Sequence, residues 1–418
     1  MQTSKTPLFT PILIVGSLIL MVGFSVRATF GVFQIPIAAE FGWLRSEFSM
    51  AIAVQNLAWG FGQPIFGAIA EKFGDRKAII LGAVIYALGL LLSSYATTPG
   101  EHQFFALFVG FGVAGTGFGV ILALVGRAAS DENRSMALGV ATAVGSAGQI
   151  FGPPVAEYLL GFMNWSVVFM IFSAAILASL LLLPLMGKPI DQSSDDLNET
   201  LKDILGKAFR DPSFTLIFLG FFSCGFQLAF ITAHFPAFVT EACSTISPDS
   251  FLASIGVKTT SSLGALSIAV IGLANIIGTI TAGKLGQTYQ RKHLLAGIYI
   301  GRTIVAGTFI LLPMTPLTVL LFAACMGLLW LATVPLTSGL VGYIYGLRFM
   351  GTLYGIVFFS HQLGSFLGVW LGGRLYDIYG NYNAVWWVGV GVGAFSAIVH
   401  FPVIEKPLRA RAAIATRA

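Results

Sequence analysis

The sequence predicts an all-α membrane protein whose twelve transmembrane helices form two parallel six-helix repeats. Composition is the first reason. Of the 418 residues, 56% are hydrophobic and only 10% are charged, whereas soluble domains carry about 25% charged residues. The second reason is that the charges fall between apolar runs of about 20 residues, the length of a bilayer-spanning helix. The third is a set of glycines that recurs in the second half of the chain.

The apolar runs are numbered as spans 1 to 12 in chain order. In the first half they lie near residues 11–37, 48–70, 78–96, 103–125, 135–161 and 165–186. In the second half they lie near residues 213–239, 262–283, 293–313, 317–341, 351–375 and 383–404. Span 1 lacks an A-x-A-like cleavage site after a short apolar core, so we expect a retained helix and not a signal peptide.

Lysine and arginine predict the orientation of the spans. With the N-terminus inside, 18 of the 23 Lys and Arg residues fall in cytoplasmic segments. Three fall in outer segments (Arg45, Lys258 and Arg374), and Arg27 and Arg302 lie within spans. This bias follows the positive-inside rule and predicts that both termini are cytoplasmic. It also explains the net charge of +5 without a nucleic-acid partner, because basic loops face anionic lipid.

The sequence carries no signature of a metal, a cofactor or a catalytic centre. Its three cysteines, Cys224, Cys243 and Cys325, match no metal or disulfide framework. The glycine-rich GVAGTGFG of span 4 has no preceding soluble strand, and close helix packing explains it better than phosphate binding. We therefore expect no cofactor and no enzyme. A membrane receptor is another possible function class, but the tail after Glu405 is too short for a signalling domain.

The two halves of the chain repeat each other at an offset of 216 residues. Five glycine pairs coincide at this offset: Gly62 with Gly278, Gly67 with Gly283, Gly139 with Gly355, Gly148 with Gly364, and Gly152 with Gly368. Spans 2 and 5 thus match spans 8 and 11. We predict an N-terminal bundle at 1–186, a linker at 187–212 and a C-terminal bundle at 213–418, an organisation typical of transporters that rock two bundles around a central site.

The linker 187–212 is the longest polar stretch of the chain. Leu201, Ile204, Leu205 and Ala208 recur in it at helical spacing, which predicts an amphipathic helix along the inner membrane surface. A disordered tether is the alternative.

The loop between spans 2 and 3 reads GAIAEKFGDRK, from Gly67 to Lys77. Gly67 allows neighbouring helices to approach, and Gly74 permits a tight turn. Across that turn Glu71 can pair with Arg76 or Lys77. Such a charged latch on the inner face would hold one conformation and release in another. The equivalent loop of the second half, GKLGQTYQRK, keeps the glycine and the basic pair but carries Gln287 in place of the acid.

This loop closely resembles the G-x-x-x-D-x-x-G-R-[RK] signature of the major facilitator superfamily, with Glu71 in place of the usual Asp. The run GSAGQIFGPP in span 5 resembles the superfamily's Gly-Pro motif, without its trailing glycine pair. The stretches RATFGVFQIPIAAEFGW, NLAWGFGQPIFGAIAEKFGDR and FFSHQLGSFLGVWLGGRLYD look like bacterial relatives of the monocarboxylate and oxalate/formate porters.

The resemblance implies the major facilitator fold and a monomeric secondary transporter in a bacterial cytoplasmic (inner) membrane. In this superfamily, spans 1, 2, 4, 5, 7, 8, 10 and 11 surround the substrate cavity. The monocarboxylate branch often places an arginine in span 8 against the substrate carboxylate. Span 8 of this chain has no arginine, and Asn275 is its only strongly polar residue near the middle.

Polar residues form stripes on the helices that should surround the cavity. Residues seven apart lie on one helix face, and Arg27 with Gln34, Asn56 with Gln63, Gln227 with His234, and Tyr354 with His361 have this spacing. We predict the following substrate-binding residues: Arg27, Gln34, Gln55, Asn56, Trp59, Gln149, Gln227, His234, Asn275, Tyr354, His361 and Gln362. The alternative for each amide is a hydrogen bond to a neighbouring helix, and for Trp59 it is packing.

Arg27 is the residue that most narrows the choice of substrate. A charge at the centre of a span costs about 2.5–3.5 kcal/mol on insertion scales, and no Asp or Glu lies at matching depth in any span. Either backbone and side-chain oxygens satisfy Arg27, or an anion does. We predict transport of a small organic anion, a mono- or dicarboxylate, by alternating access. The alternatives are an importer or exporter of a neutral or apolar molecule, for which 36 Phe could line a pocket, and an anion exchanger.

Proton coupling would need a titratable group in the membrane. Proton-coupled carriers commonly use a buried carboxylate, and the spans contain none near the midplane. Of the five histidines, His234 and His361 are the two that fall on cavity helices, and histidine titrates near neutral pH. We therefore predict these two as proton-coupling candidates. A helix-bonding role for either, or exchange without protons, remains the alternative.

Overall fold

The computed structural model describes residues 8–43, 45–187 and 200–408, and helices dominate all three ranges. The side chains of a few helical residues, Gln34 among them, lie outside the described part. The first half comprises α1 (Pro11–Ala28), α2 (Phe30–Phe41), α3 (Arg45–Phe73), α4 (Asp75–Ser93), α5 (Pro99–Thr116), α6 (Phe118–Ala128), α7 (Arg134–Leu160), α8 (Trp165–Ser179) and the 3-10 helix η1 (Leu180–Met186).

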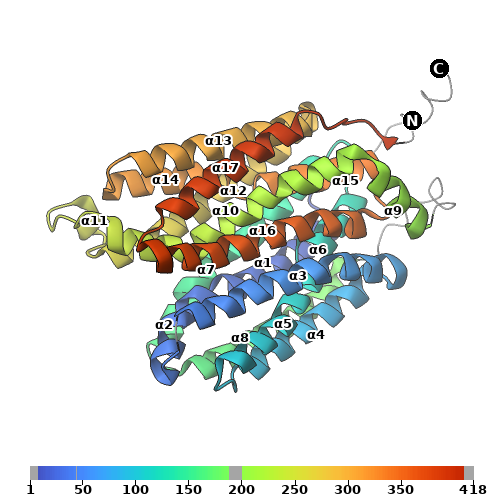
Figure 1. Cartoon of the computed structure of the whole chain (residues 1–418). Coiled ribbons are helices and arrows are strands. Elements are labelled where there is room, and N and C mark those ends of the chain that lie inside the picture. Colours follow the sequence, from blue (N-terminus) through green and yellow to red (C-terminus); the bar gives the residue numbers. More distant parts are fainter. Residues whose placement is uncertain (1–7, 44, 188–199, 409–418) are drawn as a thin grey trace.

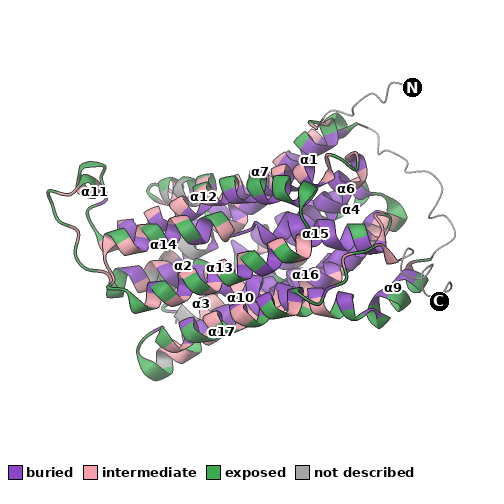
Figure 2. Ribbon diagram, turned by 90° about the horizontal axis from the view of Figure 1, so that it is seen from above, coloured by how far each residue is buried: buried purple, intermediate pink, exposed green. Residues whose placement is uncertain are grey.

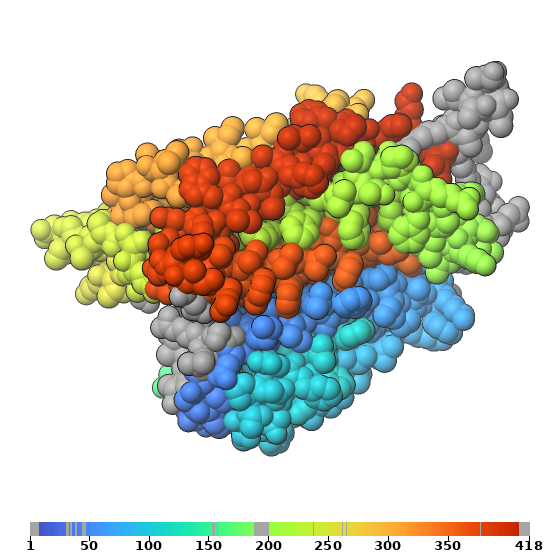
Figure 3. Space-filling view, viewed as in Figure 1, coloured from blue at the N-terminus to red at the C-terminus, as the bar shows by residue number. Residues whose placement is uncertain are grey.

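A short helix, α9 (Leu201–Arg210), precedes the second half. The second half then comprises α10 (Pro212–Ala242), α11 (Phe251–Ser254), α12 (Thr260–Thr288), α13 (Arg291–Leu311), α14 (Pro316–Leu329), α15 (Thr333–Tyr345), α16 (Met350–Tyr379) and α17 (Asn383–His400). Figure 1 shows the blue-to-cyan helices of the first half gathered below those of the second half, and Figure 3 shows the two halves as adjoining lobes.

The twelve predicted spans correspond to these helices. Ten helical segments of the described part are long and apolar enough to cross a membrane. The remaining two spans are α3 and α7, which at 29 and 27 residues are also long enough. They are more polar because they carry Gln55, Asn56, Gln63, Thr142 and Gln149. All of these except Gln149 are almost fully buried, so polar residues on these helices face protein and not lipid.

Three spans are interrupted, which the sequence pattern did not predict. Span 1 is divided into α1 and α2 at Thr29, whose hydroxyl donates to the Val26 carbonyl at 2.6 Å. Span 4 is divided at Gly117, between α5 and α6. Span 10 is divided at Trp330–Ala332, between α14 and α15. Hydropathy does not reveal such breaks, because the apolar composition continues through them.

Glycines bring helix pairs into close contact, as the GVAGTGFG stretch predicted. A Cβ on Gly112 would lie 2.2 Å from the backbone nitrogen of Tyr86, and one on Gly115 would lie 2.6 Å from the Cα of Gly82. No larger side chain fits at these positions of the α4–α5 contact. Helices in a bilayer associate largely through such backbone approaches.

The two halves meet along α3 with α16 and along α7 with α12. Among the repeated glycines at these contacts, Gly67 packs on the backbone of Gly351, and Gly283 packs on Gly139. Buried residues face the interior of the bundle and exposed ones cover its outer surface (Figure 2). We call the end of the bundle that carries Gly74, Gly187 and α9 the linker face. The charge bias predicts that this face is cytoplasmic.

The amphipathic pattern near residue 205 corresponds to α9. Thr200 caps its first turn, with Asp203 completing a capping box. Ile204 and Ala208 are buried against the bundle, whereas Lys207, Phe209 and Arg210 are exposed. Residues 188–199 of the predicted linker lie outside the described residues.

Candidate functional site

A cavity of about 110 Å³ lies between the two halves. Its first-half wall comes from spans 1, 2, 4 and 5, and includes Arg27, Gln55, Asn56, Trp59, Phe118 and Gln149. Its second-half wall comes from spans 7, 10 and 11, and includes Leu228, Ala229, Ala233, Trp330, Val334, Phe358 and His361. None of the described side chains of span 8 lines it. Besides Arg27, five of the predicted binding residues line this cavity: Gln55, Asn56, Trp59, Gln149 and His361.

Arg27 projects from the last turn of α1 and is held by α3. Its Nη2 donates to the Oδ1 of Asn56, and its guanidinium carbon lies 4.8 Å from the ring centroid of Trp59. A planar cation over an indole face gains a cation–π attraction. Nε of Arg27 has no hydrogen-bond partner among the described residues. Two side chains that also line the cavity thus fix the guanidinium, and part of its donor capacity is left unused.

The second-half wall is apolar at the position that corresponds to Arg27. Gly148 and Gly152 of α7 pack on the carbonyls of Met21 and Ser25 in α1. Their repeat partners Gly364 and Gly368 of α16 pack on the carbonyls of Phe222 and Phe226 in α10. Arg27 lies two residues beyond Ser25, and Leu228 lies two residues beyond Phe226. The cavity is therefore asymmetric, with a cation on one side and a leucine at the equivalent place on the other.

His361 is the titratable residue of the second-half wall. Neither of its ring nitrogens has a hydrogen-bond partner among the described residues, and the side chain is 7% exposed. The ring stacks on Phe358 at 5.0 Å, and Phe358 contacts Trp59 at 4.8 Å. Arg27, Trp59, Phe358 and His361 thus form a continuous series of contacts that joins the two halves through the cavity.

Gln55, Asn56, Trp59 and Gln149 also line the cavity, whereas five other predicted binding residues do not. Gln227 donates to the Gly389 carbonyl at 2.8 Å, and Asn275 accepts from the Leu331 N–H at 2.9 Å. His234 lies 3.0 Å from the Val369 carbonyl and 3.5 Å from the Tyr382 hydroxyl. These three side chains join helices within the second half.

Tyr354 and Gln362 are fully buried in α16 outside the cavity lining. Tyr354 packs its ring near Phe358, with centroids 5.9 Å apart. Gln362 lies against Gly60 of α3, where the halves meet. Gln34 falls in α2, and its side chain lies outside the described residues.

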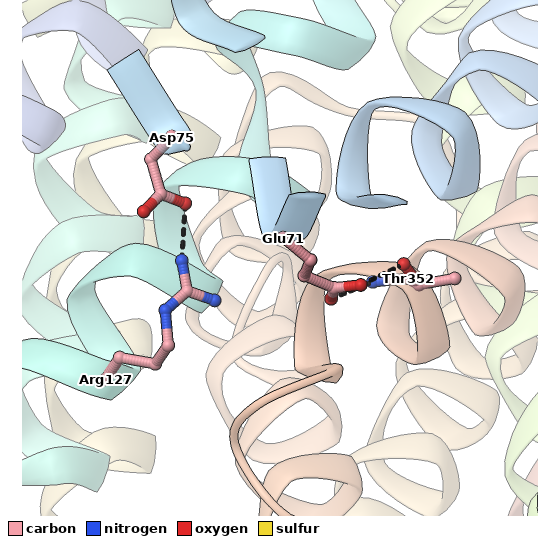
Figure 4. A network of polar contacts seen from close by, with 4 residues as sticks. All are labelled: Glu71, Asp75, Arg127 and Thr352. Carbon is pink, nitrogen blue, oxygen red and sulfur yellow. Dashed lines mark hydrogen bonds and ion pairs between the residues drawn. The ribbon is translucent and has the colours of Figure 1, made fainter. Parts of the chain in front are cut away.

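The predicted latch residues form contacts at the linker face, but the partners differ from those that the sequence suggested. Glu71 does not pair with Arg76 or Lys77. It accepts from the backbone N–H of Thr352 at 3.0 Å and from the Thr352 hydroxyl at 2.5 Å. Thr352 lies in the first turn of α16, so the contact joins the two halves (Figure 4). The N-terminus of a helix presents free N–H groups, and these supply hydrogen-bond donors to the carboxyl group of Glu71.

The rest of the loop binds within the first half. Asp75 pairs with Arg127 of α6, as Figure 4 shows. Arg76 donates to the carbonyl of Gly187, and Lys77 is exposed. Gly74 has a φ of +99°, which supports its predicted role in the turn. Sequence separation alone favoured the Glu71–Arg76 pairing, and the approach of α16 from the other half overrides it.

The second copy of the loop repeats these contacts with different chemistry. Lys292, equivalent to Arg76, donates to the carbonyl of Val403 at 2.9 Å, and Val403 is equivalent to Gly187. Gln287, equivalent to Glu71, donates to the carbonyl of Glu132 in the first half at 2.8 Å. Both copies therefore hold the halves together at the linker face, but only the first does so with a titratable group.

Glu71 lies one residue beyond the predicted span 48–70. Burial raises the pKa of Glu71 to about 7, and the hydrogen bonds from Thr352 act against this shift. In water the pKa of a glutamate is about 4.3. The closed contact therefore binds a proton more tightly than a separated one. Its stability is greatest at low pH and falls as the pH rises through about 7.

We expect acidification from about pH 8 to about pH 6 to favour the closed linker face in the wild type and not in Glu71→Gln. The amide mimics the protonated acid and does not titrate. The measurement is the alkylation rate of a cysteine at position 123, which packs near Gly351, in a chain whose three native cysteines are replaced by alanine. Thr352→Val is the control that keeps the backbone donor. If the pH dependence of alkylation is the same with Glu71 and with Gln at this position, the latch is not pH-sensitive.

Sequence reasoning missed Thr352, the partner of Glu71, and the apolar wall formed by Leu228, Ala229 and Ala233. The 216-residue offset could have indicated the equivalence of Arg76 and Lys292, because it aligns the two loops directly. No sequence signal identifies Thr352, since its role depends on how the halves dock.

Comparison with known proteins agrees with this architecture. The model of the Major Facilitator Superfamily matches residues 15–369. The chain is 26% identical over 399 residues to the uncharacterized MFS-type transporter YcxA of Bacillus subtilis (strain 168), covering 91% of this chain and 92% of that protein. It is 28% identical over 407 residues to monocarboxylate transporter 13 of Bos taurus, covering 92% and 88%.

Solved structures show the same fold. The Escherichia coli fucose:proton symporter FucP superposes with a TM-score of 0.67 at 17% identity, covering 93% of this chain and 97% of that one. The proton:xylose symporter XylE superposes with a TM-score of 0.69 at 15% identity, covering 97% and 98%. With the family match extending over most of the chain, these findings identify the protein as a membrane transporter and not an enzyme: it belongs to the major facilitator superfamily.

Proposed function

We propose that this protein is a secondary active transporter of small organic anions, and that its substrates are monocarboxylates with an apolar body. The substrate carboxylate binds Arg27, and alternating access of the two halves moves it across the membrane. The single observation that carries the proposal is the position of Arg27: it is the one lining residue of the described cavity with a permanent charge, and no carboxylate neutralises it there.

The asymmetry of the cavity favours one carboxylate over two. Polar groups lie near Arg27, on the first-half wall: Gln55, Asn56 and Gln149. The opposite wall presents Leu228, Ala229, Ala233, Trp330 and Val334, with polar side chains from Thr232, His361 and Ser365. This wall has no permanently charged residue among those described, so a second carboxylate held against its apolar part would be buried without a counter-charge, which is costly. An apolar body would gain free energy by removing its surface and that wall from water.

The comparisons support this proposal in part. The two relatives named monocarboxylate transporter 13 match 92% and 90% of the chain, at 28% and 27% identity. The named sugar:proton symporters share the fold alone. The branch's arginine of span 8 is missing, and Arg27 of span 1 supplies a guanidinium to the same central cavity. A neutral apolar solute is the other candidate, because the second-half wall would accept it equally.

Three ligands on one skeleton separate these possibilities. They are 3-phenylpropionate with one carboxylate, phenylsuccinate with two, and 3-phenylpropan-1-ol with none. We expect purified protein to bind 3-phenylpropionate at least about tenfold more tightly than either of the others, since a charge-assisted hydrogen bond contributes about 1.5–3 kcal/mol. We also expect proteoliposomes to take up 3-phenylpropionate faster than protein-free liposomes.

Tighter binding of the alcohol would identify a neutral solute as the substrate class, and tighter binding of phenylsuccinate would identify a dicarboxylate. Either result would contradict the proposal. Protein-free liposomes are essential to the uptake measurement, because the neutral form of a weak acid crosses a bilayer unaided.

A further inference from the structure

The interruption of span 10 forms part of the cavity wall. Helix α14 ends at Leu329 and α15 begins at Thr333, and Trp330, Leu331 and Val334 line the cavity. Irregular backbone at membrane depth survives only where protein or a water-filled cavity satisfies its polar groups. The chain must therefore supply partners for the carbonyls that end α14 and for the N–H groups that follow.

Arg302 of α13 supplies the donors. It is fully buried. Its Nε and Nη2 donate to the Leu329 carbonyl at 3.1 and 2.7 Å, and Nη2 also donates to the Trp330 carbonyl. The guanidinium carbon lies 5.5 Å from the ring centroid of Tyr299. No carboxylate pairs with Arg302 in the described part of the chain. A cation is favoured at this place because the C-terminus of a helix carries a partial negative charge.

Asn275 of α12 supplies the acceptor. Its Oδ1 accepts from the N–H of Leu331 at 2.9 Å, and the residue is fully buried. Helices α12 and α13 both pack against α14 and α15, and Figure 1 shows them together in the second half. The interruption is thus held from two helices: Arg302 binds its carbonyls and Asn275 binds its amide.

The first half holds the last turn of α5, just before its own interruption at Gly117, in a similar way. Gln63 donates from Nε2 to the carbonyl of Ala114 at 3.0 Å and accepts from Nε1 of Trp59 at 2.9 Å. Ala114 and Trp330 are related by the 216-residue offset. In both halves, therefore, a buried polar side chain binds the same carbonyl. In the first half the side chain that does so also orients a cavity residue, Trp59.

We propose that Arg302 and Asn275 are positioning residues for the substrate cavity: they fix the backbone of Trp330–Ala332 and with it the wall formed by Trp330, Leu331 and Val334. Neither residue touches the substrate. The expected effect on transport rests on the proposed function. The position of the wall does not, because it is independent of which solute the cavity binds.

The test measures the wall directly and needs no substrate. A cysteine replaces Val334 on the held wall or Ile52 on the opposite wall, each in a chain whose three native cysteines are alanine. Both are aliphatic lining residues, so they form a matched pair. N-ethylmaleimide is the probe, and its alkylation rate is compared between Arg302 and Arg302→Met, and between Asn275 and Asn275→Ala.

We expect Arg302→Met to change the alkylation rate at position 334 by about tenfold, because the equilibrium constant for exposing this side chain changes by the same factor. The alkylation rate at position 52 should stay unchanged. Arg302→Lys should restore part of the difference, because an ammonium can bind one of the two carbonyls. If Arg302→Met does not fold, Asn275→Ala provides the same comparison from the other side of the interruption.

Equal rates at position 334 with and without Arg302 would overturn the proposal. So would equal changes at positions 334 and 52, which would indicate general loosening of the protein. Binding of 3-phenylpropionate is measured in parallel with Arg374→Met as the control for an exposed arginine. A local change at 334 without any 3-phenylpropionate binding in the wild type would retain the positioning role and reject the carboxylate assignment.

Discussion

Replacement of Arg27 by alanine is expected to abolish the binding and uptake of 3-phenylpropionate while the protein still folds. The guanidinium is the only permanent charge on the cavity lining of the described residues. Without it a carboxylate would enter an apolar-walled cavity with no counter-charge. Arg27 is not part of the contacts that hold the halves together at the linker face, and its own hydrogen bond is to a cavity residue, Asn56. Its loss therefore removes a ligand for the substrate more than a support of the fold.

Replacement of Arg27 by lysine separates charge from geometry. Lysine keeps the charge but loses the planar fork that matches a carboxylate and stacks on an aromatic ring. The contacts to Asn56 and Trp59 would be lost together, so we expect affinity to fall by about tenfold or more. The measurement is isothermal titration of purified variants, with thermal unfolding as the check of folding.

Asn56→Ala provides the matched control for this experiment. It leaves the guanidinium in place but removes the acceptor that orients it, so we expect an intermediate loss of affinity. Normal binding of 3-phenylpropionate by Arg27→Ala would show that Arg27 is a structural residue, and the carboxylate assignment would lose its main support.

Composition and periodicity were sufficient to predict the fold, and the reason is physical. A bilayer requires apolar helices of a fixed length, and close helix contacts require small residues. Both requirements leave direct traces in the sequence, such as the glycine pairs Gly67–Gly283 and Gly139–Gly355. Interruptions such as Gly117 and Trp330–Ala332 leave no such trace, because the helices around them remain apolar.

For the candidate site, the sequence predicts which polar residues share a helix face, and no more than that. Spacing by seven places Gln227 and His234 on one face of α10, but it does not say which neighbour that face meets. In the structure this face meets α16 and α17, where Gly389 and Val369 supply carbonyls. The cavity is lined instead by Leu228, Ala229, Thr232 and Ala233, which at 3.6 residues per turn lie on the opposite face, about half a turn away. The packing of α10 against its neighbours determines which of the two faces lines the cavity. This packing cannot be read from a single sequence.

The same docking separates the two histidines that the sequence proposed as proton carriers. Both ring nitrogens of His234 lie near oxygen atoms, those of Val369 and Tyr382, which fits a role in joining helices. His361 lines the cavity with Arg27, and its ring nitrogens have no hydrogen-bond partner among the described residues. A proton on His361 would add positive charge to the cavity, so binding of the proton and of the proposed anionic substrate would favour each other.

We therefore expect a pH gradient, acidic on the substrate side, to drive accumulation of 3-phenylpropionate in proteoliposomes that contain the wild type. His361→Gln should abolish this dependence on the gradient but retain exchange of labelled for unlabelled substrate, because the amide keeps polarity and does not titrate. His234→Gln is the matched control, a second buried histidine of the same half, and should accumulate substrate as the wild type does. Protein-free liposomes correct for passive entry of the acid. If the gradient has no effect beyond that correction on the wild type, the transporter is not proton-coupled. If accumulation survives in His361→Gln and fails in His234→Gln, then His234, next to the Val369 carbonyl, carries the proton. His361 would then contact the substrate alone.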